Sequence, residues 1–154
     1  MGKIFSIIYF VIILIILGVV VYFVGGVSRQ TLPIQSYEYQ GSIDELVTDI
    51  NNYTKIKSDG KYFITDTVGN IHNDYSIRLT VELKVDNNII EYGLKIEPQN
   101  KTVKPVKTNV YLTKAYNRTT ISGGYQAESA GIEPLVAFFN SDILSHLKKL
   151  HKVK

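Results

Sequence analysis

The chain contains no cysteine and only three histidines among its 154 residues. The lack of cysteine rules out a cysteine nucleophile and a zinc site with thiolate ligands. His72, His146 and His151 do not have the HExxH spacing of a zinc peptidase, and the last two would lie about 140° apart around one helix. We therefore expect no metal site and no cofactor.

Sequence motifs of catalysis are also missing. There is no Gly-x-Ser-x-Gly nucleophile elbow and no glycine-rich phosphate-binding loop. The acidic group Asp44, Glu45 and Asp49 is what a helix dipole favours near its N-terminus, so it gives no reason to expect acid–base catalysis. No catalytic residue is predicted, and the chain is not expected to be an enzyme.

Neither sign of charge dominates the chain beyond Arg29, where fifteen Lys and Arg accompany fourteen Asp and Glu. Proteins that bind nucleic acid usually carry a strongly basic surface. The basic cluster at the end of the chain, Lys148, Lys149, Lys152 and Lys154, suits the negative end of a helix dipole. Nucleic acid is therefore not an expected partner.

The longest stretch without a charge runs from Ile4 to Val24, and 17 of its 21 residues are Ile, Leu, Val or Phe. As an α-helix it would be about 31 Å long, close to the thickness of the hydrocarbon layer of a bilayer. A cleaved signal peptide, the alternative, has a shorter apolar region of about 7 to 15 residues. The sequence therefore predicts a membrane anchor over residues 1–25, with residues 4–24 in the membrane.

The charges beside this segment predict its orientation. Lys3 and the amino terminus lie on one side and Arg29 on the other, and this small imbalance favours a cytoplasmic amino terminus. We expect a single-pass membrane protein whose C-terminal domain lies outside the cytoplasm. Residues 26–35 are predicted to form a linker, and the segment 36–154 is long enough for one folded domain.

Two amphipathic helices are expected in this domain. Ser42-Ile43-Asp44-Glu45 has the pattern of a capping box and should begin a helix that ends at Lys57-Ser58-Asp59-Gly60. Apolar residues at helical spacing predict a second helix from about Ile132 to Leu150. Their phase continues across Asn140-Ser141-Asp142, so one uninterrupted helix is predicted.

The clearest strand signal is an alternation of apolar and polar residues from Tyr75 to Val85, followed by a second one from Ile90 to Ile96. With Asn87-Asn88 as a two-residue turn, the two segments form a hairpin with every apolar residue on one face. The predicted pairs are Val85–Ile90, Leu83–Tyr92, Val81–Leu94 and Leu79–Ile96, with Lys84–Glu91 and Arg78–Glu97 on the other face.

A second hairpin is predicted from residues 106–116 and 119–127 around Asn117-Arg118. Gly123-Gly124 within it indicates a bend or a close approach by another element. The predicted pairs are Val110–Tyr125, Leu112–Gly123 and Lys107–Glu128. Strands over residues 36–40 and 61–68 bring the expected number to six.

The order of strand, capped helix, antiparallel strands and long C-terminal helix is similar to the helix-grip fold. The chain resembles the START-like (SRPBCC) superfamily, which includes polyketide cyclases and Bet v 1 type proteins, over Ser36 to Tyr53 and Ser141 to Leu150. The resemblance implies an α+β domain with a curved antiparallel sheet of about six strands, a short N-terminal helix and a long C-terminal helix packed on the sheet. It also implies an apolar cavity for a hydrophobic small molecule or lipid, lined by Leu79, Val81, Tyr92, Leu94, Leu112, Tyr125, Val136 and Phe139.

Three functions follow as hypotheses. The first is a membrane-anchored domain that binds a hydrophobic ligand or lipid without catalysis. The second is an envelope assembly or scaffold factor with a filled core, which contacts another membrane protein; Tyr111 and Tyr116 could then mark the contact surface. The third, a cyclase or hydrolase, lacks an activated residue. A cavity of about 300 Å³ or more would favour the first over the second.

Overall fold

The computed structural model describes residues 32–57, 59–70, 73–100 and 106–150, together with Ile13, Ile15 and Ile16. Residues 1–31 and 32–154 form two compact units. Within the described part of the chain, no helix is both long and apolar enough to cross a membrane. The predicted membrane segment, residues 4–24, lies almost entirely outside the described residues and stays a prediction.

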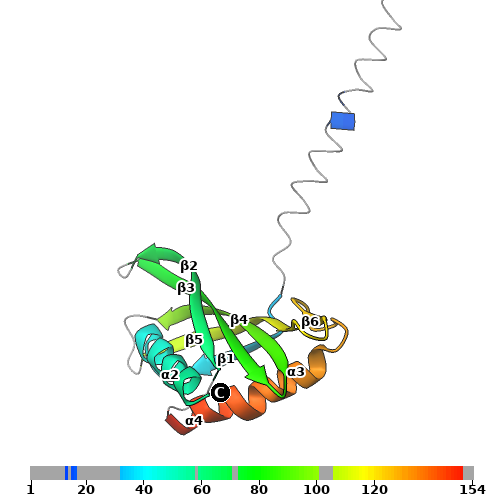
Figure 1. Cartoon of the computed structure of the whole chain (residues 1–154). Coiled ribbons are helices and arrows are strands. Elements are labelled where there is room, and N and C mark those ends of the chain that lie inside the picture. Colours follow the sequence, from blue (N-terminus) through cyan, green and yellow to red (C-terminus); the bar gives the residue numbers. More distant parts are fainter. Residues whose placement is uncertain are drawn as a thin grey trace, which may run out of the picture. The chain divides into compact units, whose positions relative to one another are not determined.

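The second unit is an α+β domain with a curved antiparallel sheet of six strands, as predicted (Figure 1). The sheet order is β1-β5-β4-β3-β2, and the short β6 pairs with β5. The elements in chain order are β1 (Gln35–Tyr39), α2 (Ile43–Ile56), β2 (Lys61–Asn70), β3 (Asn73–Val85), β4 (Asn88–Asn100), β5 (Lys107–Asn117), β6 (Ser122–Gly124), α3 (Ile132–Phe138), the π-helical segment η1 (Phe139–Leu144) and α4 (Ser145–Leu150).

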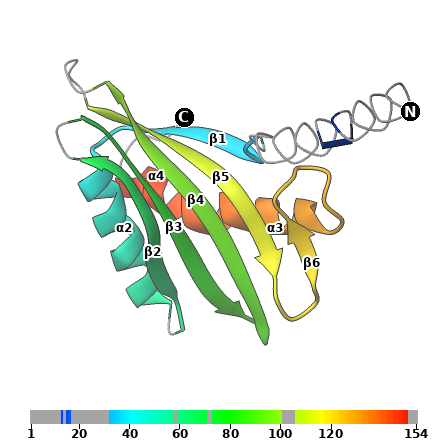
Figure 2. The same cartoon turned by 90° about the horizontal axis from the view of Figure 1, so that it is seen from above.

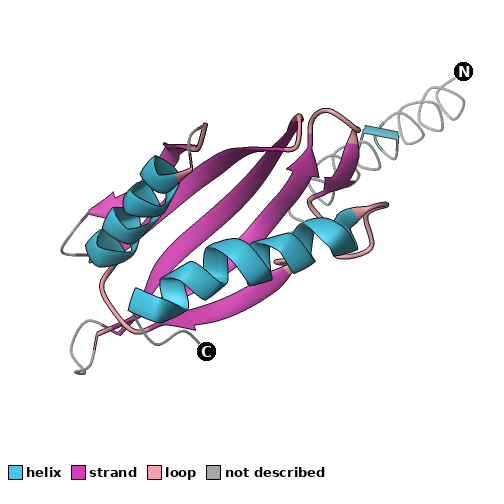
Figure 3. Ribbon diagram, turned by 60° about the horizontal axis from the view of Figure 1, so that its bottom comes forward, coloured by secondary structure: helices cyan, strands magenta, loops and turns pink. Residues whose placement is uncertain are grey.

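The helices α2 and α3–η1–α4 lie on the same face of the sheet (Figures 2 and 3). The alternating apolar residues of the strands point to this covered face and form one core with the helices. We call the other face, which no described helix covers, the outer face. The domain therefore has two layers, one formed by the sheet and the other by the helices.

The first helix begins as the sequence predicts, with a capping box at Ser42. The Ser42 Oγ accepts a hydrogen bond from the Glu45 amide at 3.2 Å, and the Ser42 amide donates to the Glu45 carboxylate at 2.7 Å. The helix ends at Ile56, where the Lys57 amide still donates to the Tyr53 carbonyl. Both predicted boundaries of α2 are confirmed.

The hairpin of β3 and β4 exists, but its predicted register is wrong by two residues. Val85 faces Asn88 and Leu83 faces Ile90, because the turn is Asp86-Asn87 with positive φ angles of 47° and 68°. A two-residue hairpin turn of this kind needs positive φ at both positions, and Asp and Asn tolerate it. A shift of two keeps the apolar residues on one face but separates the predicted partners on the other. Arg78 faces Lys95 instead of Glu97, and Lys84 faces Ile89 instead of Glu91.

The second predicted hairpin is wrong in register and in length. The strand β6 has only three residues, and Tyr116 faces Gly123. The side chain of Asn117 accepts hydrogen bonds from the amides of Thr119 and Thr120, so the chain turns through a wider loop than the predicted two residues. The predicted pairs Val110–Tyr125, Leu112–Gly123 and Lys107–Glu128 do not form.

The close approach predicted at Gly123 is confirmed. Gly123 has a φ of 84°, and a Cβ atom there would lie 2.2 Å from the Ala115 carbonyl oxygen and 2.6 Å from Leu135 Cδ1. Any larger residue would therefore clash with both the sheet and α3. Glycine at this position lets the end of the sheet pack directly against the start of the closing helix.

The closing helix is continuous, as predicted, but it is not α-helical throughout. The turns of η1 separate α3 from α4. Buried Phe139, Ile143 and Leu147 recur every four residues, and an α-helix would rotate them by about 40° at each step. The wider π turn keeps all three side chains directed at the sheet.

Candidate functional site

Most of the side chains predicted to line a cavity lie in the core between the sheet and the closing helix. Those at most 2% exposed are Leu79, Val81, Tyr92, Leu94, Leu112 and Phe139. Val136 is partly buried and packs against this core. Tyr125 follows β6, is 59% exposed and does not join the others, because the predicted register of its strand is wrong.

Tyr92 connects the two layers at the centre of this core. Its ring centroid lies 5.2 Å from that of Phe139, and its hydroxyl donates a 2.9 Å hydrogen bond to the carbonyl oxygen of Leu135. The side chain therefore extends from β4 to the main chain of α3. The space that a ligand would need at this point is filled by Tyr92 itself.

A polar cluster joins α2 to η1 beside the core. The Tyr53 hydroxyl donates to the Asp142 carboxylate at 2.7 Å, and Lys57 Nζ lies 2.8 Å from the same oxygen. The ring of His146 lies 5.4 Å from that of Tyr53. Burial favours the neutral form of Asp142, but the hydrogen bonds from Lys57 and Tyr53 and the charge of Lys57 outweigh it and lower the Asp142 pKa.

Two further tyrosines of β1 end on polar groups. The Tyr37 hydroxyl donates to Asn140 Oδ1 of η1 at 2.7 Å, and burial raises the Tyr37 pKa to about 12. The Tyr39 hydroxyl donates to the Asp49 carboxylate at 2.7 Å, and burial raises its pKa as well. Both phenols are neutral at physiological pH and act as hydrogen-bond donors between elements.

The polar side chains of this region form hydrogen bonds within the domain. Within the described ranges, every buried side-chain nitrogen or oxygen has a hydrogen-bond partner. In the same residues, no three His, Asp or Glu side chains come together as metal ligands would. His146 contacts Tyr53, whereas His72 and His151 lie outside the described residues.

The outer face carries charges and aromatic rings in an ordered pattern. Lys114 pairs with Glu91, and Arg118 lies 3.3 Å from both Glu82 and Glu91. Lys95 Nζ lies 6.0 Å from the ring centroid of Tyr111. Lys114 Nζ lies 5.4 Å from the centroid of Tyr116 and 5.6 Å from that of Tyr125. Tyr111 and Tyr116, predicted as candidates for a contact surface, therefore lie on this face beside lysines.

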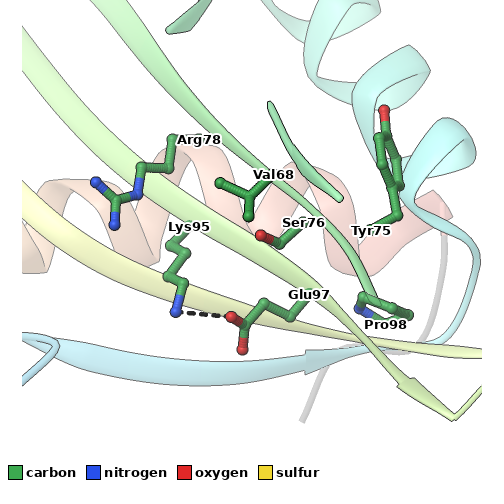
Figure 4. A pocket seen from close by; sticks show the side chains of 7 residues that line it. All are labelled: Val68, Tyr75, Ser76, Arg78, Lys95, Glu97 and Pro98. Carbon is green, nitrogen blue, oxygen red and sulfur yellow. Dashed lines mark ion pairs between the residues drawn. The ribbon is translucent and has the colours of Figure 1, made fainter. Parts of the chain in front are cut away.

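A pocket of about 440 Å³ opens at one end of the sheet. Figure 4 shows its lining: Val68, Tyr75, Ser76, Arg78, Lys95, Glu97 and Pro98. A second pocket of about 270 Å³ lies at the loop before α3 and in its first turn. None of the residues predicted to line an apolar cavity lines either pocket.

The edge strand β2 exposes apolar side chains, of which Val68 lines the first pocket. Phe63, Ile64 and Val68 are each at least half exposed. The pairing of β2 with β3 is irregular between Ile64 and Asp66 and again after Val68. Such irregularities discourage the regular pairing of an edge strand with other chains.

The sequence interpretation missed this pocket because of the hairpin register. It paired Arg78 with Glu97 across the hairpin, and an ion pair between them would have neutralised both side chains. Turn chemistry at Asp86-Asn87 could have given the correct register, and with it the juxtaposition of Arg78 and Lys95.

Comparison of the chain with protein-family models, with curated proteins and with solved structures gives no match. The resemblance to the START-like superfamily therefore rests on the order of elements, and family membership stays a prediction.

Proposed function

We propose that this protein is a membrane-anchored interaction domain, an assembly or scaffold factor that contacts another protein through the outer face of its sheet. Residues 4–24 hold it in the membrane, with the domain outside the cytoplasm. It carries out no catalysis, and its interior holds no ligand. This is the second of the three functions that the sequence suggests.

The observation that carries the proposal is the filled interior at Tyr92. A ligand between the sheet and the closing helix would have to displace the Tyr92 ring from Phe139 and break its hydrogen bond to Leu135. Breaking a buried hydrogen bond without replacement costs about 1–3 kcal/mol. The geometry thus favours a core with a structural role over a binding cavity, and hydrophobic-ligand binding stays a prediction.

The outer face supports the second half of the proposal. It is not covered by any described helix and presents Tyr111 and Tyr116 on β5 and Arg78 on β3, with β4 between these two strands. Tyrosine and arginine are enriched where proteins contact each other, because each combines a flat apolar surface with hydrogen-bond donors. A partner on this face would add a layer to the uncovered side of the sheet.

Site-specific photo-crosslinking in native membranes tests the proposal. A photoreactive phenylalanine analogue replaces Thr80, which lies on the outer face of β3, or Lys55, which is exposed on α2 on the other side of the sheet. We expect a discrete protein adduct from position 80 and none from position 55. Equal labelling at both positions, or none at position 80, would contradict a contact through the outer face.

A further inference from the structure

Among the described residues of the central strands, one cation forms no ion pair. The five basic residues described on β3, β4 and β5 are Arg78, Lys84, Lys95, Lys107 and Lys114. Each of the four lysines has a carboxylate oxygen within 4 Å. Among the described residues, Arg78 forms no ion pair, although arginine is the side chain best suited to one.

The residues that face Arg78 on the two neighbouring strands also affect its electrostatic environment. Arg78 faces Lys95 on β4, and like charges opposite each other destabilise a sheet. On its other side it faces Asp66, but no ion pair joins the two side chains. By contrast Lys61, at the start of β2, faces Glu82. The sheet thus places an unneutralised guanidinium beside a second cation.

Both cations line the 440 Å³ pocket of the outer face. Figure 4 shows Arg78 and Lys95 side by side on adjacent strands, with Lys95 directed at Glu97, 2.6 Å away. Arg78, Lys95 and Glu97 together carry a net charge of +1. The lining therefore favours an anion with a single charge, because the Glu97 carboxylate, and that of Asp66 opposite Arg78 on β2, would repel a doubly charged phosphate.

The rest of the lining limits the kind of anion further. Val68 and Pro98 give the pocket an apolar part, and Ser76 adds a hydroxyl, whereas the Tyr75 ring points away from these side chains and packs against the core (Figure 4). A guanidinium binds a carboxylate through two parallel hydrogen bonds. We propose that this Arg78 pocket receives a carboxylate of a partner protein, an Asp or Glu side chain next to an apolar one. The inference rests on the proposed function and names the chemistry of its partner.

The test uses the full chain in nanodiscs of zwitterionic lipid, with ¹⁵N labelling. The probe is the capped dipeptide acetyl-Leu-Glu-amide, and acetyl-Leu-Gln-amide is its neutral counterpart. We expect the glutamate peptide to shift the amide signals of Ser76, Arg78 and Lys95 and the glutamine peptide to leave them in place. Arg78→Gln should weaken the binding by about tenfold or more, since it removes the charge-assisted contact.

Lys84→Gln is the matched control. It removes the same charge from the outer face of the same strand, but Lys84 does not line the pocket. We expect it to change the affinity by less than about twofold, because an exposed charge outside the pocket is screened by solvent. Equal weakening by both variants, or equal shifts from both peptides, would overturn the proposal.

Two further arms distinguish other sources of negative charge. The inference would be overturned if inorganic phosphate bound more tightly than the glutamate peptide. It would also be overturned if nanodiscs of anionic lipid gave the same shifts without peptide, because a lipid headgroup would then be the ligand in place of a protein carboxylate. A crosslink from position 80 that persists unchanged in Arg78→Gln would refute the Arg78 pocket alone. Absence of any crosslink from position 80 in the chain that retains Arg78 would refute the proposed function itself.

Discussion

At the scale of the residue, tyrosine sets the distance between the sheet and the helices. Tyr37, Tyr53 and Tyr92 each extend from one element and end on a hydrogen-bond acceptor of the closing helix. A buried hydroxyl without an acceptor costs about 1–3 kcal/mol, so a helix displaced along its axis would lose these bonds one after another. The tyrosines therefore specify the position of the closing helix as well as filling the core.

The Asp142 cluster predicts how stability changes with pH. Because the Asp142 pKa is lower in the folded protein than in the unfolded chain, the carboxylate stabilises the fold above about pH 4. This contribution is lost as the pH falls through the folded pKa. We expect Asp142→Asn to lower the free energy of unfolding at pH 7 by about 0.5–1 kcal/mol, since the pair with Lys57 is partly exposed.

The measurement is urea unfolding between pH 7 and pH 3, followed by circular dichroism. The variant should lose less stability on acidification than the wild type. Asp86→Asn, at the exposed hairpin turn, is the control and should keep the wild-type acid dependence. An Asp142→Asn curve parallel to that of the wild type would show that Asp142 does not stabilise the fold through its charge.

At the scale of the element, the π turn of the closing helix accommodates the four-residue spacing of its buried side chains. Deletion of Ser141, which is exposed in η1, would change the spacing from Phe139 to Ile143 from four residues to three. Spacings of three and then four fit an ordinary α-helix, so the apolar stripe would still face the sheet. We expect the deleted chain to fold with little loss of helix content.

Deletion of Ala137, exposed in α3, is the matched comparison. It would rotate Ile132 and Leu135 by about 100° away from the core and displace the acceptor of the Tyr92 hydroxyl. We expect it to lower the free energy of unfolding by about 2 kcal/mol or more beyond the effect of deleting Ser141, judged by thermal denaturation. A larger loss from deleting Ser141 would mean that the π turn is itself required.

Sequence pattern and structure agree on the elements more closely than on how the elements pair. Alternation in β3 and β4 identified both strands and the buried face, because the side-chain period of a strand is two residues. It could not distinguish registers that differ by two, since both bury the same side chains. The conformation of Asp86-Asn87 decides between them, and the alternation pattern contains no information on it.

At the scale of the whole molecule, the domain has one covered and one uncovered face of a sheet, joined to a predicted anchor. The sequence predicted the core residues well, because burial follows from periodicity. Whether those residues enclose a cavity or fill it depends on side-chain volumes across two layers, which periodicity does not report. The contact between Tyr92 and Phe139 favours a filled core at this point, and it could be seen only in three dimensions.

The central claim is that the interior is filled and the function lies on the outer face. Leu94→Trp tests it most directly, because Leu94 is 2% exposed in the core and the chain has no other tryptophan. Urea unfolding of the full chain in detergent, followed by tryptophan fluorescence, gives the stability. Thr80→Trp, on the outer face, is the control and should change the free energy of unfolding by less than about 0.5 kcal/mol.

We expect Leu94→Trp to lower the free energy of unfolding by about 1–3 kcal/mol or more, because a packed core cannot accommodate the larger ring. Wild-type stability together with loss of a bound hydrophobic molecule would contradict the account and restore the ligand cavity.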